Sequence, residues 1–210
     1  MVAHGRFCHA PRSEGLGSGP TDRRPQPRSP GIAGGTHGPI GVTMAGAVQV
    51  QRAATGDPDV VADLLRGLPE WFGHQDALLG YAERAGRQPT FTVVEDGRCL
   101  GVLVLRDHGE ATAEMDVLAV RRDQHRRGIG RALVTAAEAD LRGRGIDFLQ
   151  VKTLGSSRPS PEYELTRRFY LALGYTPIEE FAAGTVWEDD PCLLLVRHLA
   201  CEVAGHVPVH

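Results

Sequence analysis

The segment from Glu114 to Leu141 constrains the fold more than any other part of the chain. Apolar and β-branched residues over 115–120 predict a strand, and a polar, arginine-rich loop follows it. Apolar residues then recur at the spacing of one helix face, at Ile129, Leu133, Ala136, Ala137 and Leu141. The sequence therefore predicts a strand, a turn and an amphipathic helix in succession.

Two glycines, Gly128 and Gly130, stand where the loop meets the helix. Glycine admits positive φ and removes side-chain bulk, so backbone amides at the helix start can turn toward one point. A helix N-terminus also has unpaired N–H groups and about half a positive charge, which together suit a phosphate. His125, Arg126 and Arg127 add side-chain donors beside it. The turn is therefore predicted to bind a pyrophosphate.

Two other phosphate-binding motifs do not fit this turn. A dinucleotide fingerprint needs a third glycine, and Leu133 stands in its place. A Walker loop ends in Gly-Lys-Ser/Thr, which is absent here. From spacing alone, the remaining alternative is a tight turn with no ligand.

The register instead resembles the acyl-CoA motif of the GNAT superfamily of N-acetyltransferases. That motif is Gln/Arg-x-x-Gly-x-Gly/Ala after a strand, and it reads His125-Arg126-Arg127-Gly128-Ile129-Gly130 here, with histidine in the first position. About forty residues later, the segment from Phe169 to Tyr175 resembles the family's F-Y-x-x-x-G-F/Y signature. More narrowly, the Val151–Gly155 segment and the Trp187…Pro191-Cys192 ending resemble a bacterial GNAT group of undefined substrate.

The rest of the pattern predicts a mixed α/β domain over residues 46–200. Asp57-Pro58 predicts a helix N-cap with proline at the first helical position, and Val60 is assigned to the apolar face of that helix. Asp96-Gly97 predicts a hairpin turn. Strands are expected at 47–52, 90–95, 99–106, 114–120, 148–154, 175–181 and 192–198. With the helices between them the order is β-α-α-β-β-β-α-β-α-β-β, which is also the order of the GNAT fold.

The two ends of the chain differ from this domain. Residues 1–43 contain nine glycines and six prolines, so residues 1–45 are predicted to be a disordered tail. Met44 directly precedes the first expected strand, which raises the hypothesis that translation starts there. Residues 201–210 are expected to be frayed.

Composition excludes several classes of protein. A net charge of −3 and a pI near 6.3 do not suit a nucleic-acid or membrane-surface binder. The four cysteines have no C-x-x-C spacing and read as free thiols of a cytoplasmic protein. The histidines match no set of metal ligands, so no metal is expected.

The resemblance implies particular site residues. Glu114 stands fourteen residues before Gly128, as the catalytic glutamate does in the histone-acetyltransferase branch, and is the candidate base. The alternatives are that it only solvates a strand end or that Asp116 is the base; strict alternation would put both on one face with Leu118. By resemblance, the Leu118 N–H polarises the acetyl carbonyl and Tyr170 protonates the thiolate. The residues expected to bind the cofactor are Leu118, Ala119, Val120, His125, Arg126, Arg127, Gly128, Ile129, Gly130, Arg131 and Tyr170.

The function implied is transfer of the acetyl group of acetyl-CoA to a primary amine of a small molecule or a protein, by direct attack in a ternary complex. The alternative is a catalytically silent CoA-binding module. Acidic residues at 179–180 and 188–190 are candidates to attract a cationic amine. Many relatives pair through their late strands, so a homodimer is a further expectation of the resemblance.

Overall fold

The structure is a computed structural model that describes residues 48–199. The predictions for residues 1–45, Met44 and 201–210 lie outside the described residues. The elements are β1 (Gln51–Ala53), α1 (Pro58–Arg66), α2 (Pro69–Phe72), α3 (Gln75–Ala85), β2 (Thr90–Glu95), β3 (Arg98–Asp107), β4 (Thr112–Val120), η1 (Arg122–Gln124), α4 (Ile129–Gly143), β5 (Phe148–Leu154), α5 (Pro161–Ala172), β6 (Thr176–Phe181) and β7 (Cys192–His198). No helix within the described range is long and apolar enough to cross a bilayer.

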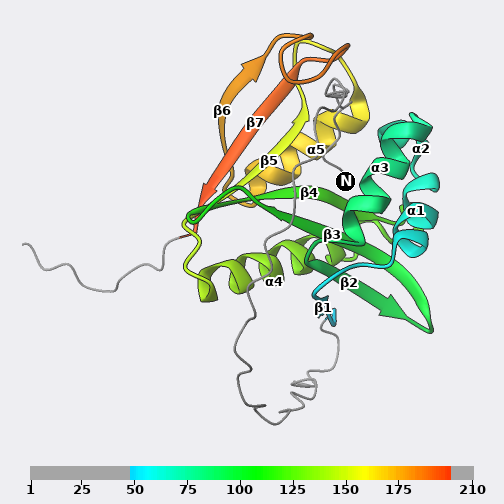
Figure 1. Ribbon diagram of the computed structural model, residues 1–210. Coiled ribbons are helices and arrows are strands. Elements are labelled where there is room, and N and C mark those ends of the chain that lie inside the picture. Colours follow the sequence, from blue (N-terminus) through cyan, green and yellow to red (C-terminus); the bar gives the residue numbers. More distant parts are fainter. Residues whose placement is uncertain (1–47, 200–210) are drawn as a thin grey trace, which may run out of the picture. The chain divides into compact units, whose positions relative to one another are not determined.

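The strands form one seven-stranded sheet in the order β1-β2-β3-β4-β5-β7-β6. Every neighbouring pair is antiparallel except β4 and β5, which are parallel. Helix α4 lies on one face of this sheet, and α1, α2 and α3 lie on the other (Figure 1). The mixed α/β class predicted from the sequence is confirmed.

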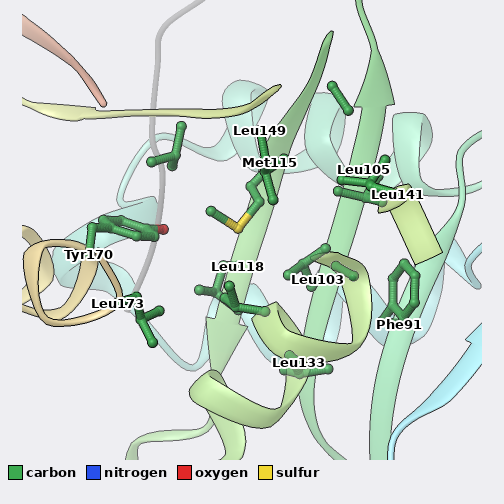
Figure 2. Close-up of a cluster of buried hydrophobic side chains, with 14 of the residues drawn as sticks. Phe91, Leu103, Leu105, Met115, Leu118, Leu133, Leu141, Leu149, Tyr170 and Leu173 are labelled. Carbon is green, nitrogen blue, oxygen red and sulfur yellow. The ribbon is translucent and has the colours of Figure 1, made fainter. Parts of the chain in front are cut away.

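Alternate residues of the central strands divide the core into two layers. On β3, Leu103 and Leu105 pack with the α4 side chains, whereas Val102 and Val104 pack with the α1–α3 side chains. Figure 2 shows the first layer, in which Leu103 lies beside Leu133 of α4. The sheet is therefore buried on both faces, which explains why its strands are nearly continuous runs of apolar residues.

Local signals in the sequence account for several boundaries. The Asp57 carboxylate accepts hydrogen bonds from the amides of Asp59 and Val60, so it caps α1 as predicted. Asp96 and Gly97 have φ of 51° and 75°, which a two-residue hairpin requires. Val60 is 38% exposed, contrary to its assignment to the apolar face, because it lies in the first turn of α1 and outside the α1–α3 core layer.

Strand β4 carries a β-bulge at Asp116. Its pairing with β3 passes from Val117 opposite Val104 to Met115 opposite Leu105, which leaves Asp116 as an extra residue. An extra residue reverses the alternation of side chains beyond it. Leu118 therefore packs on the α4 face with Met115, and the prediction that Leu118 shares a face with Glu114 is wrong.

Candidate active site

Strands β4 and β5 separate halfway along their length. Their last pair is Met115 opposite Val151, yet β4 continues to Val120 beside β3 and β5 continues to Leu154 beside β7. The divergence is visible in Figure 1, where β5 and β7 lean away from β4. On the side away from β3, residues 116–120 therefore present a strand edge that pairs with no other strand within residues 48–199.

Backbone groups along this open edge follow from the pairing on the other side. The Arg121 N–H donates to the Leu100 carbonyl of β3 at 2.8 Å, so the N–H of Ala119 also faces β3. The N–H groups of Leu118 and Val120 then face the gap. This gap-facing edge is defined by residues 118–120, the segment predicted to line the pantetheine arm.

The glycine turn closes one end of the gap. Gly128 has φ of 81° and precedes α4, and Arg126 has φ of 64°. The first hydrogen bond of α4 runs from the Ala132 N–H to the Gly128 carbonyl at 2.9 Å, so the earlier amides of the turn have no helical acceptor. A Cβ on Gly130 would meet the Phe169 ring at 3.4 Å, an ordinary van der Waals contact, so α5 packs directly beside the start of α4.

A cavity of about 480 Å³ opens at this turn, between the end of β4, the start of α4, and α5. Seven of the predicted cofactor residues line it, six of them from the turn and the start of α4: His125, Arg126, Gly128, Ile129, Gly130 and Arg131. Val120 lines it as well, from the gap-facing edge. Within residues 48–199, neither Arg126 nor Arg131 has an ion-pair or hydrogen-bond partner, so both cations remain available to an anion there.

Two side chains that were predicted to donate to a phosphate contact acceptors within the protein. The His125 Nε2 lies 2.8 Å from the Val120 carbonyl, and since a carbonyl only accepts, this nitrogen carries the proton. Burial lowers the pKa of His125, which favours its neutral form. The Arg127 guanidinium reaches Gln124 and, at 3.4 Å, Glu95, and it does not line the cavity. The side chains of His125 and Arg127 therefore hold the loop through acceptors within the protein, and their predicted role as phosphate donors stays a prediction.

Tyr170 lies on α5, on the α4 face of the sheet. Its side chain is fully buried, and its hydroxyl has no hydrogen-bond partner among the described residues. Figure 2 shows the hydroxyl directed toward the strand that carries Met115 and Leu118. Burial raises the pKa of Tyr170, so the hydroxyl keeps its proton at neutral pH. A buried hydroxyl without a partner is costly, which indicates a partner that comes from outside residues 48–199.

Glu114 lies on the opposite face, where four donors converge on its Oε2. These are Arg106 Nη2 at 2.9 Å, His108 Nε2 at 2.6 Å, Gln150 Nε2 at 3.0 Å and Lys152 Nζ at 2.8 Å. We call these five residues the Glu114 cluster. Burial alone would raise the pKa of Glu114, but the bonds and charges of Lys152 and Arg106 outweigh it and lower the pKa to about 2.

A carboxylate with this pKa is poorly suited to the predicted role of general base, because proton transfer is most efficient when the catalytic pKa lies near the working pH. Its neighbours stabilise the anion and so oppose proton uptake. Asp116, the second candidate, is 6% exposed and forms an ion pair with Arg84 of α3 at 2.8 Å. Neither carboxylate is therefore placed as a free proton acceptor.

Several residues of the site escaped the sequence analysis. Gln150 and Lys152 alternate with apolar residues along β5, a visible signal of one polar face on a buried strand. Trp71 of α2 is 7% exposed, lines the cavity and donates from Nε1 to Thr166 Oγ1 at 3.3 Å. Glu180, a candidate to attract a cationic amine, instead accepts bonds from the amides of Ser156 and Ser157.

Known proteins resemble this chain in sequence and in fold. An uncharacterised N-acetyltransferase of Chlorobaculum tepidum is 31% identical over 107 residues, which is 50% of this chain and 61% of the relative. The chain thus spans about three fifths of that relative's length. A GNAT-family acetyltransferase structure from Desulfovibrio desulfuricans has a TM-score of 0.60 at 22% identity and covers 73% of this chain and 100% of its own.

Two further structures carry functional descriptions of their own. An aminoglycoside 6′-N-acetyltransferase complexed with coenzyme A has a TM-score of 0.55 at 20% identity, over 69% of this chain and 91% of its own. The ribosomal-protein-S18-alanine N-acetyltransferase from Escherichia coli has a TM-score of 0.56 at 17% identity, over 77% and 100%. At these identities the likeness shows the fold. The profile of the acetyltransferase (GNAT) family matches residues 59–175, more than half of the sequence, and the chain belongs to that family.

Proposed function

We propose that this protein transfers the acetyl group of acetyl-CoA to a primary amine while both substrates are bound. The observation that carries the proposal is the fully buried Tyr170 hydroxyl, which has no partner within residues 48–199 and lies beside a gap in the sheet that ends at the glycine turn. The residues fit the cofactor in chemistry. The turn offers amides and the cations Arg126 and Arg131, and the gap offers a strand edge.

Each end of the site has its own role in this proposal. Amides of the 126–131 turn hold the pyrophosphate, and residues 118–120 pair with the pantetheine arm as a neighbouring strand would. The Leu118 N–H, which faces the gap, polarises the thioester carbonyl. Tyr170 donates its proton to the departing sulfur.

The acetyl transfer needs no covalent intermediate with the enzyme. The amine nitrogen forms the new C–N bond as the C–S bond breaks, the sulfur takes the Tyr170 proton, and the amine proton leaves to solvent, which reprotonates the phenolate. Neither Glu114 nor Asp116 takes that proton here, because each carboxylate already forms an ion pair, Glu114 with Lys152 and Asp116 with Arg84. Glu114 is assigned instead as a positioning residue that orients Arg106 and Lys152.

Support for an amine acceptor comes from the similar proteins, which include aminoglycoside and ribosomal-protein N-acetyltransferases. The competing proposal is a silent CoA-binding module, which would bind acetyl-CoA at the same turn but would not acetylate an amine. The two differ only in whether CoA is released when an amine is present. Binding and turnover therefore have to be measured separately.

The test measures the melting temperature with and without acetyl-CoA, in the wild type and in Gly128→Glu. A ligand at 100 times its Kd stabilises by about 2.7 kcal/mol, and the glutamate should abolish the shift by placing an anion in the phosphate site. Because Gly128 has φ of 81°, Gly128→Ala serves as the control with the same backbone strain and no charge. No shift in the wild type refutes the proposal, and a shift without CoA release for any amine favours the silent module.

A further inference from the structure

The Glu114 cluster holds more hydrogen-bond donors than its carboxylate uses. A guanidinium has five N–H groups and an ammonium three, yet among residues 48–199 neither Arg106 nor Lys152 forms an ion pair except with Glu114. The Arg106 Nε is buried and has no hydrogen-bond partner in that range. Buried N–H groups are rarely left unpaired, so this donor points to an acceptor atom from outside residues 48–199.

The cations of the cluster are the part that solvent reaches. The side chains of Arg106 and Lys152 are 28% and 23% exposed, whereas that of Glu114 is 7% exposed. Beside them, Arg84 is 22% exposed over the 4% exposed Asp116. Three full cations thus cover two carboxylates, and a molecule that approaches from the α1–α3 side meets positive charge.

The cluster lies at the end of the gap where β4 and β5 are still paired, opposite the glycine turn. Glu114 pairs with Gln150 in the second-to-last residue pair between β4 and β5. Lys152 is the first β5 residue after the last pair, which is Met115 with Val151. Tyr170 belongs to the core layer on the other face of the sheet. A thioester held between Leu118 and Tyr170 would therefore have the cluster on the side from which an amine can attack.

We infer that the acceptor is a small amine that also carries a carboxylate, such as a free amino acid, and that Arg106 and Lys152 bind this carboxylate. The inference rests on the proposed acetyl transfer and names the acceptor class for it. A polycationic amine is disfavoured, because it would have to approach exposed cations whose own carboxylate partners are buried. A carboxylate would instead take up the spare donors and leave the amine at the gap.

The test compares matched acceptors that differ only in charge. The twenty common L-amino acids and their carboxamides are assayed for acetyl-CoA-dependent CoA release, and the same compounds are titrated into the CoA-bound protein by calorimetry. We expect kcat/KM or affinity to be about 10- to 100-fold better for the carboxylate member of the preferred pair. Lys152→Met and Arg106→Gln should reduce that ratio toward one, and Arg87→Gln, an exposed cation paired with Glu83, should leave it unchanged.

Each outcome decides one question. The inference is overturned if kcat/KM is equal for the carboxylate and the carboxamide. If no compound is acetylated, equal binding affinities of the two overturn it. A preference that survives both Lys152→Met and Arg106→Gln also overturns it. These results leave the proposed function intact as long as acetyl-CoA raises the melting temperature of the wild type. The absence of that rise refutes the proposed function instead.

Discussion

Replacing Tyr170 by phenylalanine should stabilise the ligand-free protein and impair catalysis at the same time. The hydroxyl is fully buried without a partner among the described residues, and such a group costs about 1–3 kcal/mol. Its removal leaves the ring and its apolar contacts in place, so Tyr170→Phe should gain about 1–2 kcal/mol. For a domain of this size that raises the melting temperature by about 3–6 °C.

The chain offers two matched controls for this prediction. The Tyr163 hydroxyl donates to the Trp71 carbonyl at 3.3 Å, and the Tyr175 hydroxyl donates to Glu138 at 3.1 Å. Both tyrosines are buried, but their hydroxyls are paired, so Tyr163→Phe and Tyr175→Phe should lower the melting temperature because a buried acceptor loses its donor.

The assays are thermal unfolding without ligand and the kinetics of CoA release. Tyr170→Phe should lower kcat by about 100-fold, the lower range for loss of a general acid, while KM for acetyl-CoA changes little. If Tyr170→Phe is destabilised like the two controls, the hydroxyl has a partner within the protein and the reasoning fails. An unchanged kcat would show that another group protonates the sulfur.

Two further predictions concern packing and pH. A Cβ at Gly101 of β3 would lie 2.8 Å from Ile129 Cγ2 and 3.1 Å from Leu133 Cδ1, so Gly101→Ala should displace the start of α4, cost about 1–3 kcal/mol and weaken acetyl-CoA binding by about tenfold, as measured by urea unfolding and calorimetry. Gly143→Ala, where a Cβ meets nothing within 4 Å, is its control and should be neutral or slightly stabilising; equal effects of the two would contradict the argument. The pKa of Glu114 is lowered from 4.5 to about 2, so its contribution, on the order of 2–3 kcal/mol, is full above pH 5 and is lost as the pH falls toward 2. In Glu114→Gln, the free energy of unfolding should no longer show this loss at low pH. A pH dependence equal to that of the wild type would refute the assignment.

Features encoded within a few consecutive residues were predictable from the sequence. The Asp96-Gly97 hairpin, the Asp57 cap and the glycine after α5, Gly174 with φ of 84°, all depend on local backbone preferences. The turn at Gly128 was found for the same reason, since a strand, a glycine pair and a helix follow one another directly. The order of elements and the fold followed from these.

Features that depend on partners distant in the chain were not predictable. The low pKa of Glu114 requires Arg106 from β3 and Lys152 from β5, which only the sheet brings together. The bulge at Asp116 reverses the alternation of side chains beyond it. The sequence does not reveal this, because β4 carries apolar residues on both faces. Likewise, the bond from His125 to the Val120 carbonyl depends on how the loop folds back, and this cannot be read from residue types.

The position of β7 in the sheet has a consequence for how the protein is made. Although β7 comes last of the described strands, it lies between β5 and β6 and is the strand that joins them. A nascent chain that has not yet released residues 192–198 from the ribosome therefore exposes β5 as an unpaired edge and leaves β6 unattached. The first four strands can assemble during synthesis through antiparallel contacts between neighbours, whereas the half that carries Lys152 must wait. The site is thus completed at the end of synthesis, and that waiting period is when the chain is most exposed to misassembly.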